Sequence, residues 1–180
     1  METSAKKVTW NIDPAHSEVQ FKVKHLVIST VSGQFTSFSG GLEAEGDDFS
    51  NARAVFEAEI KSISTNNNDR DNHLKSADFF DAENHPKLTF VSTGFSKTGD
   101  DTYEVTGDIT IRGNTRPIVL KAEYGGTMVD PYGNTKAGFE ITGKLNRKDF
   151  GLEWSGVTET GGIVVGDEVK LLLNLQFAKN

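Results

Sequence analysis

The chain has 180 residues, a formal net charge of −7 and no cysteine, with 36% hydrophobic and 25% charged residues. This length and composition indicate one soluble globular domain with a sizeable core. The acidic balance argues against a nucleic-acid partner, because binding to phosphates requires clustered cations. The lack of cysteine excludes disulfide bonds and thiolate metal sites. Along the chain, the alternation of apolar and polar residues is the main structural signal.

The N-terminal residues predict no export signal and no membrane anchor. They read M-E-T-S-A-K-K-V-T-W, which contains no apolar h-region and no cleavage-site pattern. No run in the chain approaches the roughly 18 apolar residues that a transmembrane helix needs. We therefore expect a cytoplasmic protein without stable membrane insertion.

The segment Glu18–His25 alternates strictly between apolar and polar side chains. Val19, Phe21, Val23 and His25 share one face, and charged or amide side chains occupy the other. Successive side chains of a strand point to opposite faces, so this is a strand with one dry and one wet side. Similar patterns or apolar runs predict further strands over 8–12, 34–45, 51–62, 88–95, 103–112, 118–124, 137–145 and 169–177.

Three places depart from this regular pattern. Between Phe35 and Phe38 the apolar phase changes, which predicts a β-bulge or bend. Residues 25–30 form a short apolar patch, which we interpret as a helical turn or corner. Residues 66–81 begin with asparagines that can cap a helix and continue with charged residues around Leu74, so we expect one or two short surface helices there.

About eight or nine strands with one helical insert make the chain all-β, either a sandwich or a barrel. Short links between consecutive strands favour antiparallel neighbours, and closure into a barrel removes exposed strand edges. A barrel of about eight strands is either filled by its own side chains or holds one small ligand. We find no internal repeat or linker, so residues 1–180 are interpreted as a single domain.

Several ordered sequence blocks resemble the YceI-like family of lipid- or polyisoprenoid-binding proteins. The blocks are W-N-I-D-P-A-H-S-E-V-Q-F-K-V-K-H-L at 10–26, V-S-G-Q-F at 31–35, R-D-N-H-L-K-S-A-D-F-F-D at 70–81, H-P-K-L-T-F at 85–90, G-D-I-T-I-R-G-N-T-R-P at 107–117, N-R-K-D-F-G at 146–151 and V-G-D-E-V-K-L at 165–171. The resemblance implies a lipocalin-like, extended antiparallel β-barrel whose apolar lumen holds a long isoprenoid or similar lipid tail. Exported relatives make the periplasm the alternative location.

Apolar side chains on the dry faces are the candidates for the ligand-binding wall. We expect the lumen to be lined by Phe21, Val23, His25, Phe35, Phe38, Phe56, Ile60, Leu74, Phe79, Phe90, Ile109, Phe139 and Ile141. The alternative for each is that it packs against its neighbours, and for all of them together it is a filled barrel without a ligand.

The polar residues predict no catalytic, metal or cofactor site. The four histidines are scattered and form no metal-binding motif, and no G-x-S-x-G nucleophile elbow is present. Asp69, Arg70, Asp71 and His73 are interpreted either as a polar rim that meets a lipid head group or as a solvated helix face. Arg112 and Arg116 flank a turn, which they either stabilise or use to meet a phosphate or quinone oxygen.

The expected function is binding of a long isoprenoid, isoprenoid quinone or fatty-acyl lipid for transport, storage or sequestration. Burial of each CH₂ group contributes about 0.8 kcal/mol, so a long tail has a large driving force without any catalytic group. Two other classes stay open. One is an enzyme acting on a lipid-like substrate, for which His25 is the inward-phase candidate, and the other is a protein-interaction module. We also expect self-association as a homodimer.

Overall fold

The computed structural model of the chain describes residues 7–25, 28–45, 48–152 and 165–180; for His25, Asp48 and Val165 it describes the backbone alone. Within these residues the strands are β1 Lys7–Ile12, β2 Glu18–His25, β3 Ser29–Phe35, β4 Phe38–Glu45, β5 Asp48–Glu59, β6 Ile63–Ser64, β7 Lys87–Lys97, β8 Thr102–Ile111, β9 Asn114–Val129, β10 Thr135–Asn146 and β11 Val165–Lys179. The helical elements are α1 Asn68–Lys75 and the 3-10 turns η1 Pro14–His16, η2 Ile60–Ser62 and η3 Arg147–Phe150.

The strands close into an antiparallel barrel with eight positions. β11 pairs with β10 along one edge, and along the other edge it pairs first with β2 and then with β1. Thus β1 and β2 are one wall strand interrupted by η1, and β3 with β4 and β5 with β6 are interrupted in the same way. This confirms the predicted all-β, lipocalin-like barrel with a short helical insert.

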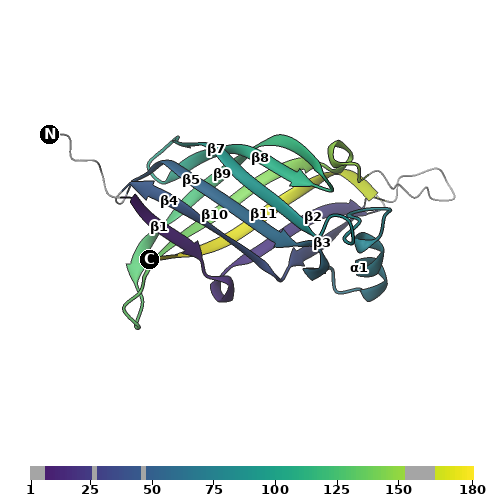
Figure 1. Cartoon of the computed structure of the whole chain (residues 1–180), viewed down its shortest axis with the longest axis horizontal. Helices are drawn as coiled ribbons and strands as arrows, with labels where there is room; N and C mark the ends of the chain where they lie inside the picture. The colour runs from purple at the N-terminus through teal and green to yellow at the C-terminus, as the bar shows by residue number, and fades with distance from the viewer. Residues whose placement is uncertain (1–6, 26–27, 46–47, 153–164) are drawn as a thin grey trace.

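Figure 1 shows the strands crossing the barrel obliquely, with α1 at one end and the C-terminus towards the other. Such a tilt is what closure of a sheet into a barrel requires. We call the end beneath α1 the mouth and the opposite end the floor. Among the described residues, no helix has the length and apolar character that a membrane crossing requires.

Local sequence explains where the wall strands break. The phase change between Phe35 and Phe38 coincides with the end of β3 and the start of β4, as the pattern predicted. β5 ends at Glu59, earlier than the alternation through residue 62 suggested, because residues 60–62 form η2. The proposed corner at 25–30 is in part wrong, since Ser29 and Thr30 belong to β3; residues 26–27 lie outside the described residues.

The β8–β9 connection is tighter than the sequence indicated. We expected a link over 113–117, but the strands are joined by Arg112 and Gly113 alone, with φ angles of 50° and 73°. Two successive positive φ angles are typical of the type I′ turn, whose twist matches that of the flanking strands. Glycine adopts this conformation readily, whereas Arg112 does so at some cost that its contacts at the mouth offset.

The helical insert begins where the asparagine run predicted. The side chain of Asn67 accepts a hydrogen bond from the backbone N–H of Arg70 at 3.1 Å, which caps α1. After α1, residues 76–85 form a series of turns, and Phe79 is buried in the core. Helix and turns together cover the mouth.

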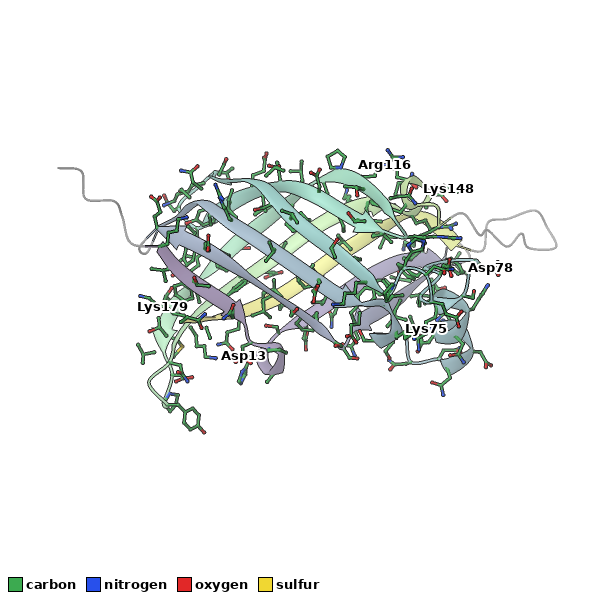
Figure 2. All side chains as sticks on the ribbon, in the orientation of Figure 1. Asp13, Lys75, Asp78, Arg116, Lys148 and Lys179 are labelled. Atoms are coloured by element: carbon green, nitrogen blue, oxygen red, sulfur yellow. The ribbon has the colours of Figure 1, made fainter. Side chains whose placement is uncertain are left out.

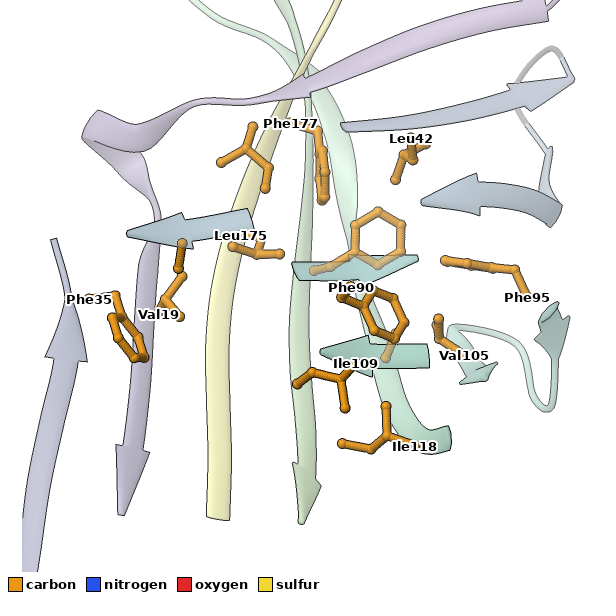
Figure 3. Packing of buried hydrophobic residues seen from close by; sticks show 14 of the residues in the cluster. Val19, Phe35, Leu42, Phe90, Phe95, Val105, Ile109, Ile118, Leu175 and Phe177 are labelled. Carbon is orange, nitrogen blue, oxygen red and sulfur yellow. The ribbon is translucent and has the colours of Figure 1, made fainter. Parts of the chain in front are cut away.

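Buried apolar side chains project into the barrel interior from several strands at once. Buried side chains of the cluster in Figure 3 come from β2, β3, β4, β7, β8, β9 and β11 and point towards one another. Because alternate residues of each strand face inward, the charged side chains other than Asp71 and Arg147 lie away from the core. In Figure 2, Lys75 and Lys148 mark the mouth.

Candidate functional site: a two-chambered lumen

Two cavities that share part of their lining occupy the lumen. The inner chamber has a volume of about 110 Å³. The outer chamber, beneath α1, has a volume of about 450 Å³. Both are lined by Phe21, Phe35, Leu88 and Leu171, which therefore form a neck between them. The arrangement is a tube that narrows with depth.

The neck has a local structural cause. Phe21 pairs across β2 and β3 with Gly33, and its ring lies where a Cβ atom of residue 33 would project. A ring covering a cross-strand glycine is held close to the wall. The ring of Phe35 packs beside it, with a centroid distance of 5.7 Å. The two rings therefore narrow the lumen between the two chambers.

The inner chamber is lined almost entirely by apolar side chains. Its lining is Ile12, Val19, Gln20, Phe21, Phe35, Gly41, Leu42, Ala54, Val55, Phe56, Leu88, Phe90, Phe95, Val105, Ile109, Ile118, Leu120, Phe139, Ile141, Leu171, Leu173, Leu175 and Phe177. Gln20 is the one member with a polar side chain. A chamber of this kind offers burial of apolar surface and no group that can exchange a proton.

Aromatic side chains close the floor of the inner chamber. Phe139, on β10, is 5% exposed. Its ring centroid lies between 5.2 and 6.4 Å from those of Phe49, Phe95, Tyr103, Tyr124 and Phe177. Trp10, 1% exposed, packs against Phe49 beyond it. Beneath the inner chamber the barrel is thus filled by its own rings.

The outer chamber combines an apolar roof with a polar rim. Leu74, Phe79 and Phe80, from α1 and the turns after it, form the roof. The polar members of the lining are Lys24, Thr65, Asn67, Asp69, Arg70, His73 and Arg147. Three of these carry a full positive charge and one a negative charge, although the whole chain is acidic. Polarity therefore increases from the floor towards the mouth.

Arg70 is held at the rim by a short hydrogen-bonded relay. Its Nε donates to Thr65 Oγ1 and a terminal nitrogen donates to the Thr65 carbonyl, both at 2.7 Å. Asp71, which is buried, accepts from the backbone N–H and the hydroxyl of Thr65 at 2.8 and 2.6 Å. A guanidinium has five N–H donors, so this anchoring leaves donors over for a ligand.

Arg147 has a different role, because backbone carbonyls take up much of its hydrogen-bonding capacity. It is 3% exposed and donates to the carbonyls of Gly166 at 2.9 Å and Leu152 at 2.6 Å. Burial lowers the pKa of its guanidinium, and Asp167, 3.5 Å away, acts in the opposite direction. Arg147 therefore fastens η3 and the start of β11 at the mouth.

The β8–β9 turn also fastens the η3 region at the mouth. A terminal nitrogen of Arg112 donates to the carbonyls of Phe79 at 2.8 Å and Gly151 at 3.1 Å. The Asn114 side chain donates to the carbonyl of Phe150 at 2.8 Å. Of the two roles considered for Arg112, this geometry supports the structural one, since it joins the roof to η3.

At the seam between β1 and β2, Asp13 joins η1 to β10. Its Oδ2 lies 2.8 Å from Lys136 Nζ and 2.7 Å from His16 Nδ1. Hydrogen bonds from Lys136 and then His16 lower the pKa of the Asp13 carboxyl from 3.8 to about 2. The side chain is 17% exposed, so the ion pair is partly shielded from solvent. We assign it a role in stability.

Most of the predicted wall residues line the two chambers. Phe56, Phe90, Ile109, Phe139 and Ile141 lie in the inner lining, Val23, Leu74 and Phe79 in the outer, and Phe21 and Phe35 in both. Their part in ligand binding stays a prediction. The side chain of His25 lies outside the described residues.

Two predicted wall residues line neither chamber. Ile60 falls in η2, where the strand alternation ends, and is 1% exposed within the core. The ring of Phe38 stacks on that of Phe56, at a centroid distance of 6.2 Å, and it is Phe56 that reaches the chamber. The alternation correctly assigned both side chains to the inward face. It does not show how far each side chain lies from the cavity.

Sequence reasoning missed part of the wall. Leu171, Leu173, Leu175 and Phe177 of β11 line the lumen, and their shared face was visible as alternation in the last strand.

Within the described residues, no group of three or more histidine, aspartate or glutamate side chains is placed to hold a metal ion.

The sequence profile of the YceI-like domain matches residues 10–177, which is nearly the whole chain. The chain belongs to the YceI-like family. A UPF0312 protein of Staphylococcus epidermidis is 36% identical over 170 residues, which are 94% of this YceI-like chain and 96% of that protein. A UPF0312 protein of Staphylococcus aureus matches with the same identity and coverage.

Solved structures share the YceI-like fold. The YceI protein of Campylobacter jejuni superposes with a TM-score of 0.74 at 34% identity, covering 87% of this chain and 90% of that one. BcnA of Burkholderia cenocepacia gives a TM-score of 0.80 at 22% identity, with 92% and 98% covered. A polyisoprenoid binding domain from Saccharophagus degradans gives 0.69 at 13% identity, with 95% and 98% covered. The last two similarities show the fold alone.

Proposed function

We propose that this YceI-like protein binds a long apolar lipid, with the tail in the two chambers and the polar head at the mouth. The observation that carries the proposal is the inner lining, where apolar side chains surround an open space. Membership of the family, and the fold shared with a polyisoprenoid binding domain, support lipid binding in the barrel. Isoprenoid and fatty-acyl tails both meet the requirement, and the proposed role is transport, storage or sequestration.

The energetics favour a pre-formed lumen of this kind. Burial of apolar surface yields roughly 25 cal/mol per Å², and ordering of a flexible tail takes much of it back. Drug-sized ligands settle near about 0.3 kcal/mol per non-hydrogen atom, so a tail of some 20 carbons supplies roughly 6 kcal/mol. Micromolar affinity is then within reach once a head-group contact adds to the tail.

The polar groups favour binding over catalysis. Among the described residues, all titratable side chains that line the lumen belong to the outer chamber. General acid–base chemistry on a buried tail would need such a group within hydrogen-bonding reach of the reacting atom. We therefore propose that the lipid leaves the barrel chemically unchanged.

The test is to extract the protein, purified from its own cells without detergent, with organic solvent and to identify bound lipids by mass spectrometry. We expect a prenyl or fatty-acyl compound at close to one per chain, and uptake of an added prenyl or acyl lipid by the delipidated protein. An empty extract together with no uptake would refute the proposal.

We keep the homodimer and the cytoplasmic location as proposals. Multi-angle light scattering tests the homodimer, and cell fractionation tests the location.

A further inference from the structure

The floor of the lumen limits how far a tail can enter, and Phe139 occupies its centre. Along β10, alternate inward positions mark the depth: Phe139 at the floor, Ile141 in the inner chamber and Leu145 in the outer chamber. Register fixes the same order on β11, where Leu175, Leu173 and Val169 lie opposite them. The positions of these residues along the two strands therefore define the length of the tube between floor and mouth.

Strand geometry converts this order into a length. Phe139 and Leu145 are six residues apart, about 20 Å along a strand at roughly 3.3 Å per residue. With a barrel tilt of about 35–45°, this is roughly 15 Å along the axis. An extended chain advances about 1.1–1.2 Å per bond, since three backbone bonds of a peptide span about 3.3–3.6 Å. The tube thus takes about 13 bonds, or between three and four isoprene units of four chain bonds each.

The cavity volumes give an independent estimate. An apolar cavity of about 150 Å³ holds one benzene ring, which has about the size of one isoprene unit. On this scale the two chambers, at about 110 and about 450 Å³, together hold between three and four units. Length and volume agree on a total of between three and four units, so the fourth is the upper limit.

We propose that Phe139 is the residue that sets the tail length this protein accepts, with an upper limit of about four isoprene units. The inference rests on the proposed lipid binding and specifies its ligand. The ring of Phe139 is held in place by the aromatic side chains around it, so a tail that reaches it can advance no further. Units beyond the fourth remain outside the mouth and add little apolar burial.

A ladder of prenyl monophosphates with 10, 15, 20, 25 and 45 carbons tests the limit, because the head group is constant. Affinity is measured by displacement of N-phenyl-1-naphthylamine from the delipidated protein. We expect about a tenfold gain per added unit up to 20 carbons and less than a threefold change from 20 to 45. A gain that continues through 25 and 45 carbons would overturn the length limit alone. Failure of every length to bind would overturn the lipid-binding function as well.

Substitution at the floor identifies the residue responsible. Phe139→Leu shortens the side chain, and we expect the affinity plateau to move from 20 to 25 carbons. Leu145→Ala, at the mouth end of the same strand, should weaken every length by a similar factor without moving the plateau. If Phe139→Leu does not fold, as judged by circular dichroism, Phe95→Leu alters the same ring cluster from β7 and should move the plateau likewise. A folded floor variant with an unmoved plateau would remove Phe139 from this role.

Discussion

The two ends of this barrel differ in how their side chains pack, although the same sheet forms both. At the floor, aromatic rings from seven strands pack against one another, several of them edge to face. At the mouth, a short helix and a 3-10 turn span an open chamber and are held by hydrogen bonds to backbone carbonyls. We therefore expect the packed floor to contribute more to stability than the mouth, where the larger cavity lies.

The largest expected effect is on the free energy of unfolding, when one phenylalanine ring is removed from each end and the two losses are compared. Phe49→Ala at the floor should lower the free energy of unfolding by about 3–5 kcal/mol, because it leaves a closed cavity among rings that cannot collapse. Phe80→Ala at the roof should cost clearly less, since it widens a chamber that is already open. Urea denaturation followed by circular dichroism measures both. Equal losses of unfolding free energy would show that the two ends contribute equally to stability.

A second test places a charge on each side of the same strand. Leu173 faces the inner chamber, and its neighbour Leu172 borders a groove on the outer surface. Leu173→Glu should weaken uptake of a prenyl lipid at least 100-fold, because a carboxylate in an apolar chamber excludes the tail or attracts water. Leu172→Glu should bind as the native protein does. Retained uptake in folded Leu173→Glu would show that the tail lies elsewhere.

The seam at Asp13 is expected to make the barrel acid-sensitive. Because Lys136 and His16 lower the pKa of Asp13 from 3.8 to about 2, its contribution to stability is complete above pH 3.8 and is lost as the pH falls towards 2. The shift corresponds to about 2 kcal/mol at neutral pH.

Asp13→Asn should remove that contribution and flatten the dependence of unfolding free energy on pH in this range. Asp108→Asn serves as the control, since Asp108 is exposed on β8 and makes no ion pair among the described residues. Thermal melts of the three proteins between pH 2 and pH 7 give the comparison. An equally steep acid loss in Asp13→Asn would assign it to other carboxylates.

The sequence predicted the wall far better than it predicted the two ends. Alternation identifies which residues face inward, and for Phe56, Ile109 and Ile141 that was enough to place them on the lumen. It does not distinguish a ring that borders a cavity from one that meets other rings, as the floor around Phe139 shows. Nor does it detect a change to a 3-10 turn, which is why Ile60 was assigned to the wall.

The polar parts of the site depend on contacts that no spacing rule encodes. Arg70 and Asp71 were visible as a rim or a helix face, but Thr65, which joins them, carried no signal of its own in the sequence. Arg147 stood only within the N-R-K-D-F-G block at 146–151, and no pattern in the sequence indicated that its side chain would be buried against the carbonyls of residues 152 and 166. Their partners lie between five and nineteen residues away along the chain, in turns and short elements that leave no periodic pattern in the sequence.

The smallest expected effect is on the affinity for a charged lipid, when Arg70 at the polar rim is replaced. Arg70 is anchored by Thr65 and lines the outer chamber, and hydrogen bonds between a guanidinium and an anion are stronger than neutral ones. Arg70→Gln should therefore weaken a prenyl monophosphate about tenfold while leaving the alcohol of the same tail almost unchanged. Lys75→Gln is the matched control, because Lys75 belongs to the same helix but does not line the chamber. Displacement titrations give both affinities. An equal loss for alcohol and phosphate would mean that Arg70 shapes the roof and does not recognise a charged head, so the difference between the two ends would be one of packing alone.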